Sequence, residues 1–255
     1  MLYLPRKTII MRAYNLGFIT DENIFNHVKE TVKRFSDSIN LADFNKNIID
    51  PIKLTFDAKV YGRSIEDVIA AECIRQMDKS NNNHIGYFHQ NLFRYAGNGW
   101  AVPNKGFDVV NEERHIFVEM KNKHNTMNSA ASAKTYMKMQ HKIVRDSKAV
   151  CMLVEVIAAH SQDKTWIVTV DGEQFDNDHI RRVSIDRFYG IVFEDELAFS
   201  KLCKTLPIVL DDVIMEMGNK KRENTVFTEL NDLSPDVMKS LYLLAFKTYE
   251  GFEHF

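Results

Sequence analysis

The stretch from Gly106 to Asn128 reads GFDVVNEERHIFVEMKNKHNTMN. Its two apolar runs, Phe107–Val110 and His115–Lys121, are separated by the polar tetrapeptide NEER, which predicts a β-hairpin. Ionisable groups are costly inside such runs unless they are paired or bind a partner. The hairpin nevertheless carries three of them: Asp108, Glu119 and Lys121.

The expected hairpin brings these three side chains to one face. We expect Val110 to pair with His115 across the turn. Side chains along paired strands alternate between the two faces, so Asp108, Glu119 and Lys121 point the same way. Glu119 is then the diagonal neighbour of Asp108, at roughly 7–8 Å.

A close pair of carboxylates points to a metal ion, because the two groups repel each other unless a cation lies between them. Mg²⁺ suits the pair, since it takes oxygen ligands and is usually bound by only one or two protein carboxylates. Bound Mg²⁺ lowers the pKa of water and stabilises charge on phosphoryl oxygens. Lys121 can orient the attacking water, help to deprotonate it or neutralise the developing charge. The pattern favours phosphodiester hydrolysis, with an ion-paired sheet edge as the alternative.

Helical and strand patterns alternate along the rest of the chain. Ser80–His84 (SNNNH) is expected to break the chain, and an aromatic-rich helix should follow up to Gly97. The other expected helices are Asp21–Ile39, Ser64–Met77, Ser129–Ser147, Asp195–Met217 and Pro235–Tyr249, and the other expected strands are Ala149–Ala159 and Thr165–Gly172. The strand–helix–strand order from His115 to Ala159 predicts a right-handed crossover and a mixed β-sheet flanked by helices, which is an α/β fold.

The expected helix Ser129–Ser147 carries a basic stripe. Its apolar side, which includes Met137 and Val144, keeps a 3.6-residue period and is expected to be buried, and the opposite side holds Lys134, Lys138, Lys142 and Arg145. The net charge is only −2, so this stripe is a local feature that phosphates could occupy or that water could solvate.

Composition excludes several classes of protein. The chain has 255 residues, of which 45% are hydrophobic and 27% charged, and no apolar run is long enough to cross a bilayer. The N-terminus lacks the layout of a signal peptide. Three dispersed cysteines, Cys73, Cys151 and Cys203, indicate buried free thiols and a reducing cytoplasm.

The run FDVV…IFVEMKNK resembles the catalytic signature of the PD-(D/E)XK nucleases. With GYFHQNLFRYAG before it and KHNTMNSA after it, the chain is similar to type II restriction endonucleases that cut the palindrome GGNCC. The resemblance extends through FNKNIIDPIKLTFD and SIDRFYGIVFEDELAFSKLCKTLPIVLDDV, from roughly Asn15 to Met217. Phe107 stands where the motif has proline, a position that tolerates change across the superfamily.

The resemblance implies a single restriction endonuclease-like domain, with a helical flank at 1–63, a nuclease core at 64–217 and a helical appendage at 218–255. It also implies Mg²⁺ as cofactor, double-stranded DNA as substrate and a homodimer, because a palindrome has two-fold symmetry. The protein would act in a prokaryotic cytoplasm beside a companion DNA methyltransferase that is not a physical partner.

Site residues are carried over in the same way. Asp108 and Glu119 would bind the metal, with the Met120 main-chain carbonyl as a further ligand and Lys121 as the catalytic lysine. Glu66 or Glu72 could add a carboxylate, and Glu72 is favoured because it lies on an apolar stripe. Candidate DNA contacts are Lys123, His124, Asn125, Asn128, Lys134, Lys138, Arg181 and Arg182.

Three alternatives stay open. A repair or junction nuclease would share the catalytic motif, and a DNA-binding protein could use the scaffold without catalysis. The hairpin could also be an incidental ion pair in a helical interaction protein. Asp43 with Asp57-Ala58-Lys59 repeats the motif string, but in a segment with no clear strand.

Overall fold

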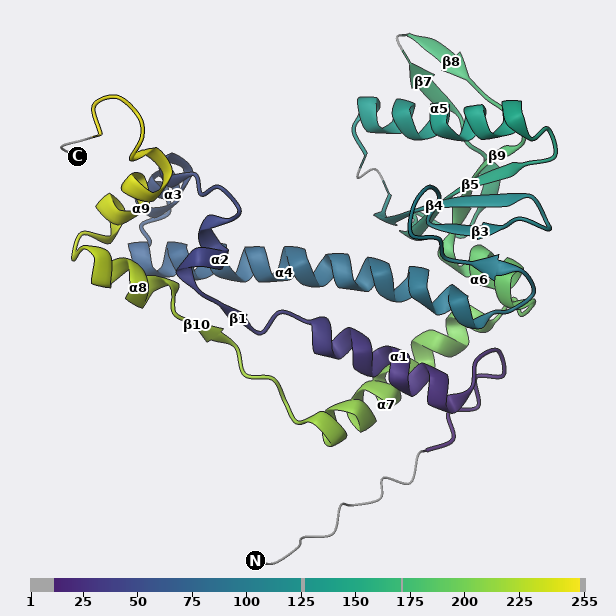
Figure 1. Ribbon diagram of the computed structural model, residues 1–255, viewed down its shortest axis with the longest axis horizontal. Coiled ribbons are helices and arrows are strands. Elements are labelled where there is room, and N and C mark those ends of the chain that lie inside the picture. The colour runs from purple at the N-terminus through teal and green to yellow at the C-terminus, as the bar shows by residue number, and fades with distance from the viewer. Residues whose placement is uncertain (1–11, 125–126, 171, 253–255) are drawn as a thin grey trace, which may run out of the picture. The chain divides into compact units, whose positions relative to one another are not determined.

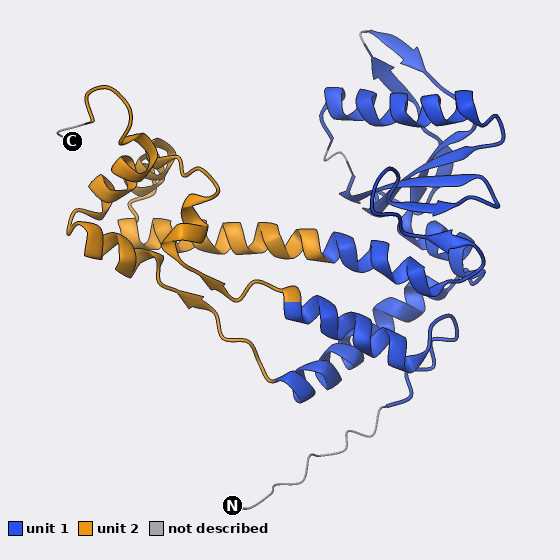
Figure 2. Cartoon of the chain, viewed as in Figure 1, with its two compact units in different colours: residues 1–33, 85–217 blue, residues 34–84, 218–255 orange. Residues whose placement is uncertain are grey.

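The computed structural model describes residues 12–124, 127–170 and 172–252. The chain forms two compact units, residues 1–33 with 85–217 and residues 34–84 with 218–255 (Figure 2). Helix α4 (Ile65–Leu92) contributes residues to both. None of the described helices is long and apolar enough to cross a membrane.

A six-stranded mixed sheet forms the centre of the first unit (Figure 1). The β4–β5 and β5–β9 pairs are parallel, whereas β2–β3, β3–β4 and β6–β9 are antiparallel. The fold is therefore the mixed α/β arrangement predicted from the sequence. In spatial order the strands are β2 (Trp100–Ala101), β3 (Val109–Asn111), β4 (Ile116–Lys123), β5 (Val150–Ile157), β9 (Ile180–Ser184) and β6 (Asp163–Thr165).

The two faces of this sheet bury different helices. Helix α5 (Ser129–Arg145) links β4 to β5 and packs Tyr136 and Met139 against Phe117 on one face. The other face packs against α1 (Asp21–Arg34), α6 (Ile185–Phe193), α7 (Ala198–Met217), the end of α4 and the 3-10 turn η1 (Phe93–Tyr95). A hairpin of β7 (Val168–Val170) and β8 (Glu173–Phe175) extends from the α5 side. β4 and β5 are thus covered on both faces, which accounts for their apolar sequences.

Side-chain caps set the starts of helices α1 and α4. Thr20 Oγ1 accepts from the Asn23 amide at 3.2 Å before α1, and Ser64 Oγ accepts from the Asp67 amide at 3.1 Å before α4. The predicted break at Ser80–His84 is wrong, because α4 continues through it. Asn81 is buried there, and its side chain accepts from the Ser36 amide at 2.7 Å. This polar run therefore forms a continuous part of the helix.

The second unit is helical, with a short parallel pairing of β1 (Ser38–Ile39) and β10 (Glu223–Asn224). Its core includes Phe44, Leu54, Ile69 and Leu230. Besides the first part of α4 it holds α2 (Leu41–Asn45), α3 (Pro51–Val60), α8 (Val226–Leu233) and α9 (Val237–Phe246). The decoy acids Asp43 and Asp57 lie on helices α2 and α3, so they form no catalytic hairpin.

One inference from cysteine usage needs correction. Cys73 and Cys151 are buried free thiols, as expected, but Cys203 is exposed. Cys203 lies on α7, whose buried residues include Leu202 and Val209 but not this thiol. An apolar neighbourhood in the sequence therefore did not fix the side of the helix on which the cysteine stands.

Candidate active site

The β3–β4 hairpin is present with a register two residues from the expected one. Val110 pairs with Phe117 and not with His115, and the turn spans residues 112–115. Asn111 extends the first strand because its buried side chain donates to the Asn98 carbonyl at 2.8 Å and accepts from the Arg114 amide at 3.0 Å. A shift of two residues keeps each side chain on its expected face, and Asp108 lies directly before β3, next to Val109, which pairs with Val118.

Asp108 is held by three hydrogen bonds at the start of this hairpin. Its amide donates to the Val118 carbonyl at 2.8 Å, and its carboxylate Oδ2 accepts from the Met120 amide at 2.7 Å. Its own carbonyl accepts from Gln90 Nε2 of α4 at 3.1 Å. Backbone and carboxylate are therefore both fixed against β4.

Glu119 is half-buried on β4, with 12% of its side chain exposed. Burial raises its pKa and the charge of Asp108 raises it further, while Lys138 and Lys121 partly offset both effects. Because Asp108 and Lys121 act on Glu119 electrostatically, the structure brings the three motif side chains to one locality. Among the described residues no hydrogen bond or ion pair holds the Lys121 ammonium.

Lys138 of α5 also reaches this locality. Its ammonium forms an ion pair with Glu119 Oε1, donates to the Gly106 carbonyl at 2.7 Å and lies 4.4 Å from the centre of the Phe107 ring. The centre of the Phe107 ring, at the position where the motif that the sequence resembles has proline, lies 5.5 Å from that of Phe117. The aromatic ring thus supplies a surface that proline would not.

The basic stripe of α5 is oriented differently from the prediction. Lys142 lies 3.8 Å from the centre of the Phe117 ring, so Lys138 and Lys142 turn toward the sheet. Met137 and Val144, expected to be buried, are 55% and 76% exposed. The stem of a lysine is apolar and its ammonium group binds aromatic rings. Lys138 and Lys142 can therefore lie at the edge of the core, where the sequence pattern predicts only apolar residues.

The oxygen donors at this site fit a hard divalent cation. The Asp108 carboxylate is hydrogen-bonded to β4, and burial together with repulsion from Asp108 raises the pKa of Glu119, which favours a nearby positive charge. No group of three or more His, Cys, Asp or Glu side chains among the described residues could hold a metal ion. Mg²⁺ requires no such group, since one or two protein carboxylates with waters suffice.

A family model described as Eco47II restriction endonuclease matches residues 16–215. The type II restriction enzyme Sau96I of Staphylococcus aureus is 32% identical over 228 residues, which cover 84% of this chain and 87% of that enzyme. The chain belongs to the Eco47II restriction endonuclease family. The type II restriction enzyme Eco47II of Escherichia coli is 34% identical over 125 residues, 48% of this chain and 52% of that enzyme. No solved structure matches the chain.

Membership of the Eco47II family makes the protein a type II restriction endonuclease, a nuclease that acts on double-stranded DNA. The family match spans nearly the same residues as the resemblance found in the sequence. It includes all of the β3–β4 hairpin and α5. The side chains around Glu119 are therefore the candidate catalytic apparatus of a family member.

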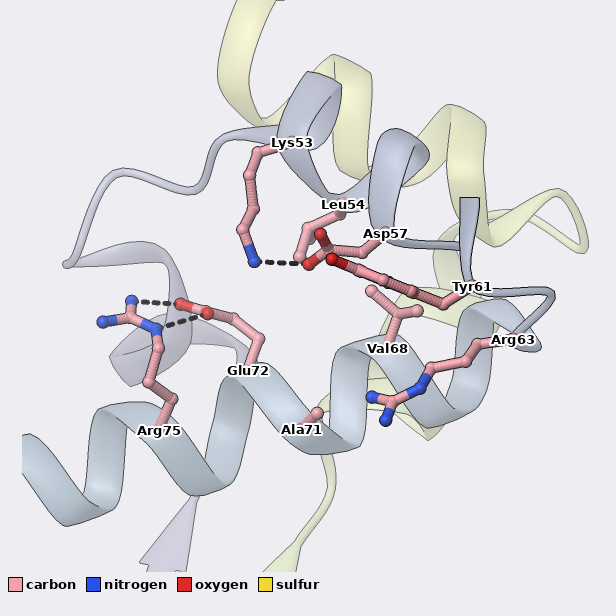
Figure 3. A pocket seen from close by; sticks show the side chains of 9 residues that line it. All are labelled: Lys53, Leu54, Asp57, Tyr61, Arg63, Val68, Ala71, Glu72 and Arg75. Carbon is pink, nitrogen blue, oxygen red and sulfur yellow. Dashed lines mark hydrogen bonds and ion pairs between the residues drawn. The ribbon is translucent and has the colours of Figure 1, made fainter. Parts of the chain in front are cut away.

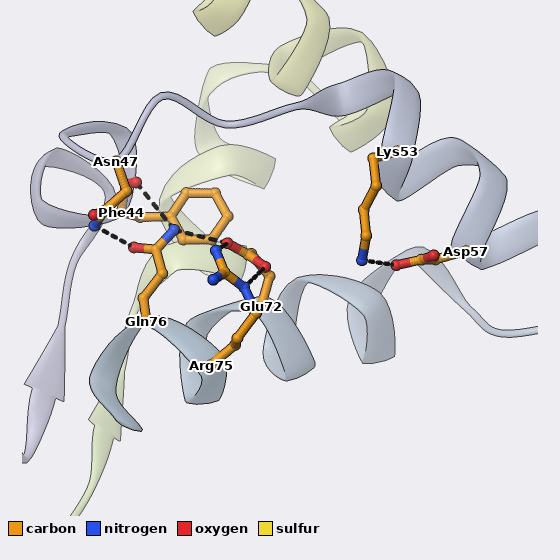
Figure 4. A network of polar contacts seen from close by, with 7 residues as sticks. All are labelled: Phe44, Asn47, Lys53, Asp57, Glu72, Arg75 and Gln76. Carbon is orange, nitrogen blue, oxygen red and sulfur yellow. Dashed lines mark hydrogen bonds and ion pairs between the residues drawn. The ribbon is translucent and has the colours of Figure 1, made fainter. Parts of the chain in front are cut away.

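Glu66 and Glu72, the candidates for a further metal-binding carboxylate, lie on the part of α4 that belongs to the second unit. Glu66 is exposed, whereas Glu72 is half-buried and lines a pocket of about 270 Å³ between α3 and α4 (Figure 3). Arg75 and Gln76 both donate to Glu72, and these bonds and charges lower its pKa although burial acts in the opposite direction (Figure 4). Its acceptors are thus engaged within its own unit, and its role as a metal ligand stays a prediction.

The candidate DNA contacts are dispersed over the first unit. Asn128 caps α5 by accepting from the Ala131 amide at 2.8 Å, and Arg181 donates to Asp163 at 2.8 Å. Lys123 and Lys134 are exposed. Asn125 lies outside the described residues. Contact with DNA stays a prediction for each of these side chains.

His124 and Arg182 converge on a glutamate that sequence reasoning missed. Glu155 of β5 is 1% exposed and is the register partner of Lys121. Arg182 donates to its Oε1, and His124 Nδ1 lies 3.1 Å from its Oε2. Burial alone would raise the pKa of Glu155, but these partners outweigh it and lower the pKa. An acid inside the apolar run AVCMLVEVIAA was the available signal.

Proposed function

We propose that the protein hydrolyses phosphodiester bonds in double-stranded DNA at GGNCC, with Mg²⁺ bound by Asp108 and Glu119. The observation that carries the proposal is the β3–β4 hairpin, where Asp108 is hydrogen-bonded to β4 near Glu119 and Lys121. Family membership supports the reaction, and similarity to GGNCC-cutting enzymes supports the target. A repair nuclease and a non-catalytic scaffold are disfavoured by that membership and by the intact motif.

Different residues would bind the metal ion and position the attacking water. Asp108 and Glu119 would hold the ion, with the Met120 carbonyl as a further ligand, and the amide of Met120 keeps Asp108 in place. When bound, Mg²⁺ would activate water and stabilise charge on the phosphate oxygens. Lys121 would orient the attacking water and neutralise charge that develops on the phosphate.

Recognition would involve the basic residues around this site. Guanine presents O6 and N7 in the major groove, where arginine and lysine bind best. Lys123, Arg182 and the α5 lysines are candidates for base or phosphate contact. Since GGNCC is palindromic, we propose that two copies of the chain act as a homodimer, each cutting one strand. The bacterial relatives suggest action in the cytoplasm, with a companion methyltransferase that protects the host DNA.

A digest of DNA of known sequence tests the proposal. With Mg²⁺, cleavage is expected at GGNCC sites, and with EDTA no cleavage is expected. Glu119→Ala should retain specific binding in Ca²⁺ but lose cleavage by a factor of at least about 10³. Glu173→Gln, an exposed change on β8, serves as control. Unspecific smearing would remove the GGNCC assignment, whereas full cleavage by Glu119→Ala would remove the metal site.

A further inference from the structure

Lys138 occupies the position of a counter-ion at the candidate metal site. Its ammonium contacts the Glu119 carboxylate, the Gly106 carbonyl and the face of the Phe107 ring. Two of these partners are oxygen atoms and the third is a π face, so all three attract a cation. Glu119 lies on β4, and Gly106 and Phe107 directly precede Asp108 in the chain.

A divalent ion and this ammonium compete for the same carboxylate. A metal ion bound by Glu119 would lie within a few ångströms of the Lys138 ammonium, and the two positive charges would repel each other strongly in a half-buried site. Lys138 can withdraw, because 37% of its side chain is exposed and its stem has four rotatable bonds. Asp108, by contrast, is fixed by its hydrogen bonds.

We propose that Lys138 is the resident counter-ion of the metal-free site, and that metal binding displaces its ammonium from Glu119 and makes it available to a DNA phosphate. The inference rests on the proposed function, since it assumes that Glu119 binds the metal. It assigns to Lys138 a positioning role that Lys121 does not have. Lys138 would bind a phosphate of the DNA backbone only when a metal ion occupies the site. In the metal-free protein Lys138 therefore neutralises Glu119 and makes no contact with a DNA phosphate.

The first test is calorimetric titration of the full chain, without DNA, with Mn²⁺ and separately with Ca²⁺. Lys138→Met keeps the apolar stem and removes the competing charge, so it should bind the metal roughly tenfold more tightly. Lys138→Arg retains the competition and should stay near the wild-type affinity. Lys134→Met, one helical turn earlier and exposed, should leave metal affinity unchanged. Unchanged or weakened metal binding by Lys138→Met would overturn the proposal.

Glu119→Ala separates this inference from the proposed function. If that variant binds metal as wild type does, Glu119 is not a ligand and the metal site itself is wrong. If it loses metal binding while Lys138→Met matches wild type, the metal site stands and the counter-ion role fails.

A second test measures DNA binding against salt concentration, by anisotropy with an uncleaved duplex. In Ca²⁺, the wild-type slope of log affinity against log salt should exceed that of Lys138→Met by about 0.9, the value of one phosphate contact. In EDTA the two slopes should coincide, because Lys138 is then held by Glu119. If the slopes of wild type and Lys138→Met differ by the same amount in Ca²⁺ and in EDTA, Lys138 contacts a phosphate whether or not metal is bound. That result would refute the proposed displacement of Lys138 by metal.

Discussion

Glu155→Gln tests the buried network that joins β4, β5 and β9. Glu155 is 2% exposed at its side chain and Arg182 is 19% exposed. The substitution keeps the shape of the side chain but leaves Arg182 without a counter-charge, and the Arg182 Nε already has no hydrogen-bond partner among the described residues. Stability should therefore fall.

The expected loss follows from the burial of the pair. Removing one partner of a fully buried ion pair costs about 3–5 kcal/mol. Since Arg182 keeps some contact with solvent, we expect a loss of about 2–3 kcal/mol in the free energy of unfolding at pH 7. For a chain of this length, that corresponds to a decrease of about 5–10 °C in Tm.

The pH dependence of the effect follows from the lowered pKa of Glu155. A carboxyl whose pKa is lower in the folded state contributes stability above its ordinary pKa of 4.5 and loses it as the pH falls toward the folded value. Urea unfolding of wild type and Glu155→Gln from pH 7 to pH 4 should therefore show a gap that narrows below about pH 4.5. Glu173→Gln, exposed on β8, is the matched control. A gap under about 0.5 kcal/mol at pH 7, or one that widens in acid, would refute the reasoning.

Further predictions concern α5 and the sheet. Asn128→Ala removes the cap of α5 and should lower the free energy of unfolding by about 1 kcal/mol in urea titration, whereas no loss would mean that the cap is not used. Val118→Ala, at a position with 0% exposure, should cost about 2–3 kcal/mol in the same assay, and a change below about 1 kcal/mol would contradict the packing. Lys134→Ala should reduce the salt slope of DNA binding in Ca²⁺ by about 0.9, and an unchanged slope would place this part of α5 away from the phosphates.

Local patterns predicted the hairpin, α5 and β5, because each is specified by its own alternation or periodicity. The hairpin register was two residues off, and the reason lies outside the hairpin. Asn111 pairs within the strand because its side-chain Nδ2 donates to the Asn98 carbonyl. An asparagine in a polar tetrapeptide gives no indication that it will be buried.

The orientation of side chains was harder to predict than the elements themselves. The periodicity predicts that Lys138 and Lys142 lie on the polar side of α5, but their partners Glu119 and Phe117 lie on β4. Their contacts depend on how α5 lies on the sheet, which periodicity does not encode. The same limit explains why α4 continues through Ser80–His84, where Asn81 is retained by a contact with Ser36.

Glu155 and Glu119, on the α5 face of the sheet, differ in how far neighbouring side chains already neutralise their negative charge. Glu155 has both oxygens engaged by Arg182 and His124, and its lowered pKa reflects an anion already satisfied by the protein. Glu119 is repelled by the charge of Asp108, its pKa is raised, and the ion pair that engages its Oε1 comes from a flexible lysine. A cation from solution should bind more favourably at Glu119 than at Glu155, because it offsets the repulsion between Glu119 and Asp108. Of these two glutamates, the one with the less satisfied charge is thus the one suited to binding a metal.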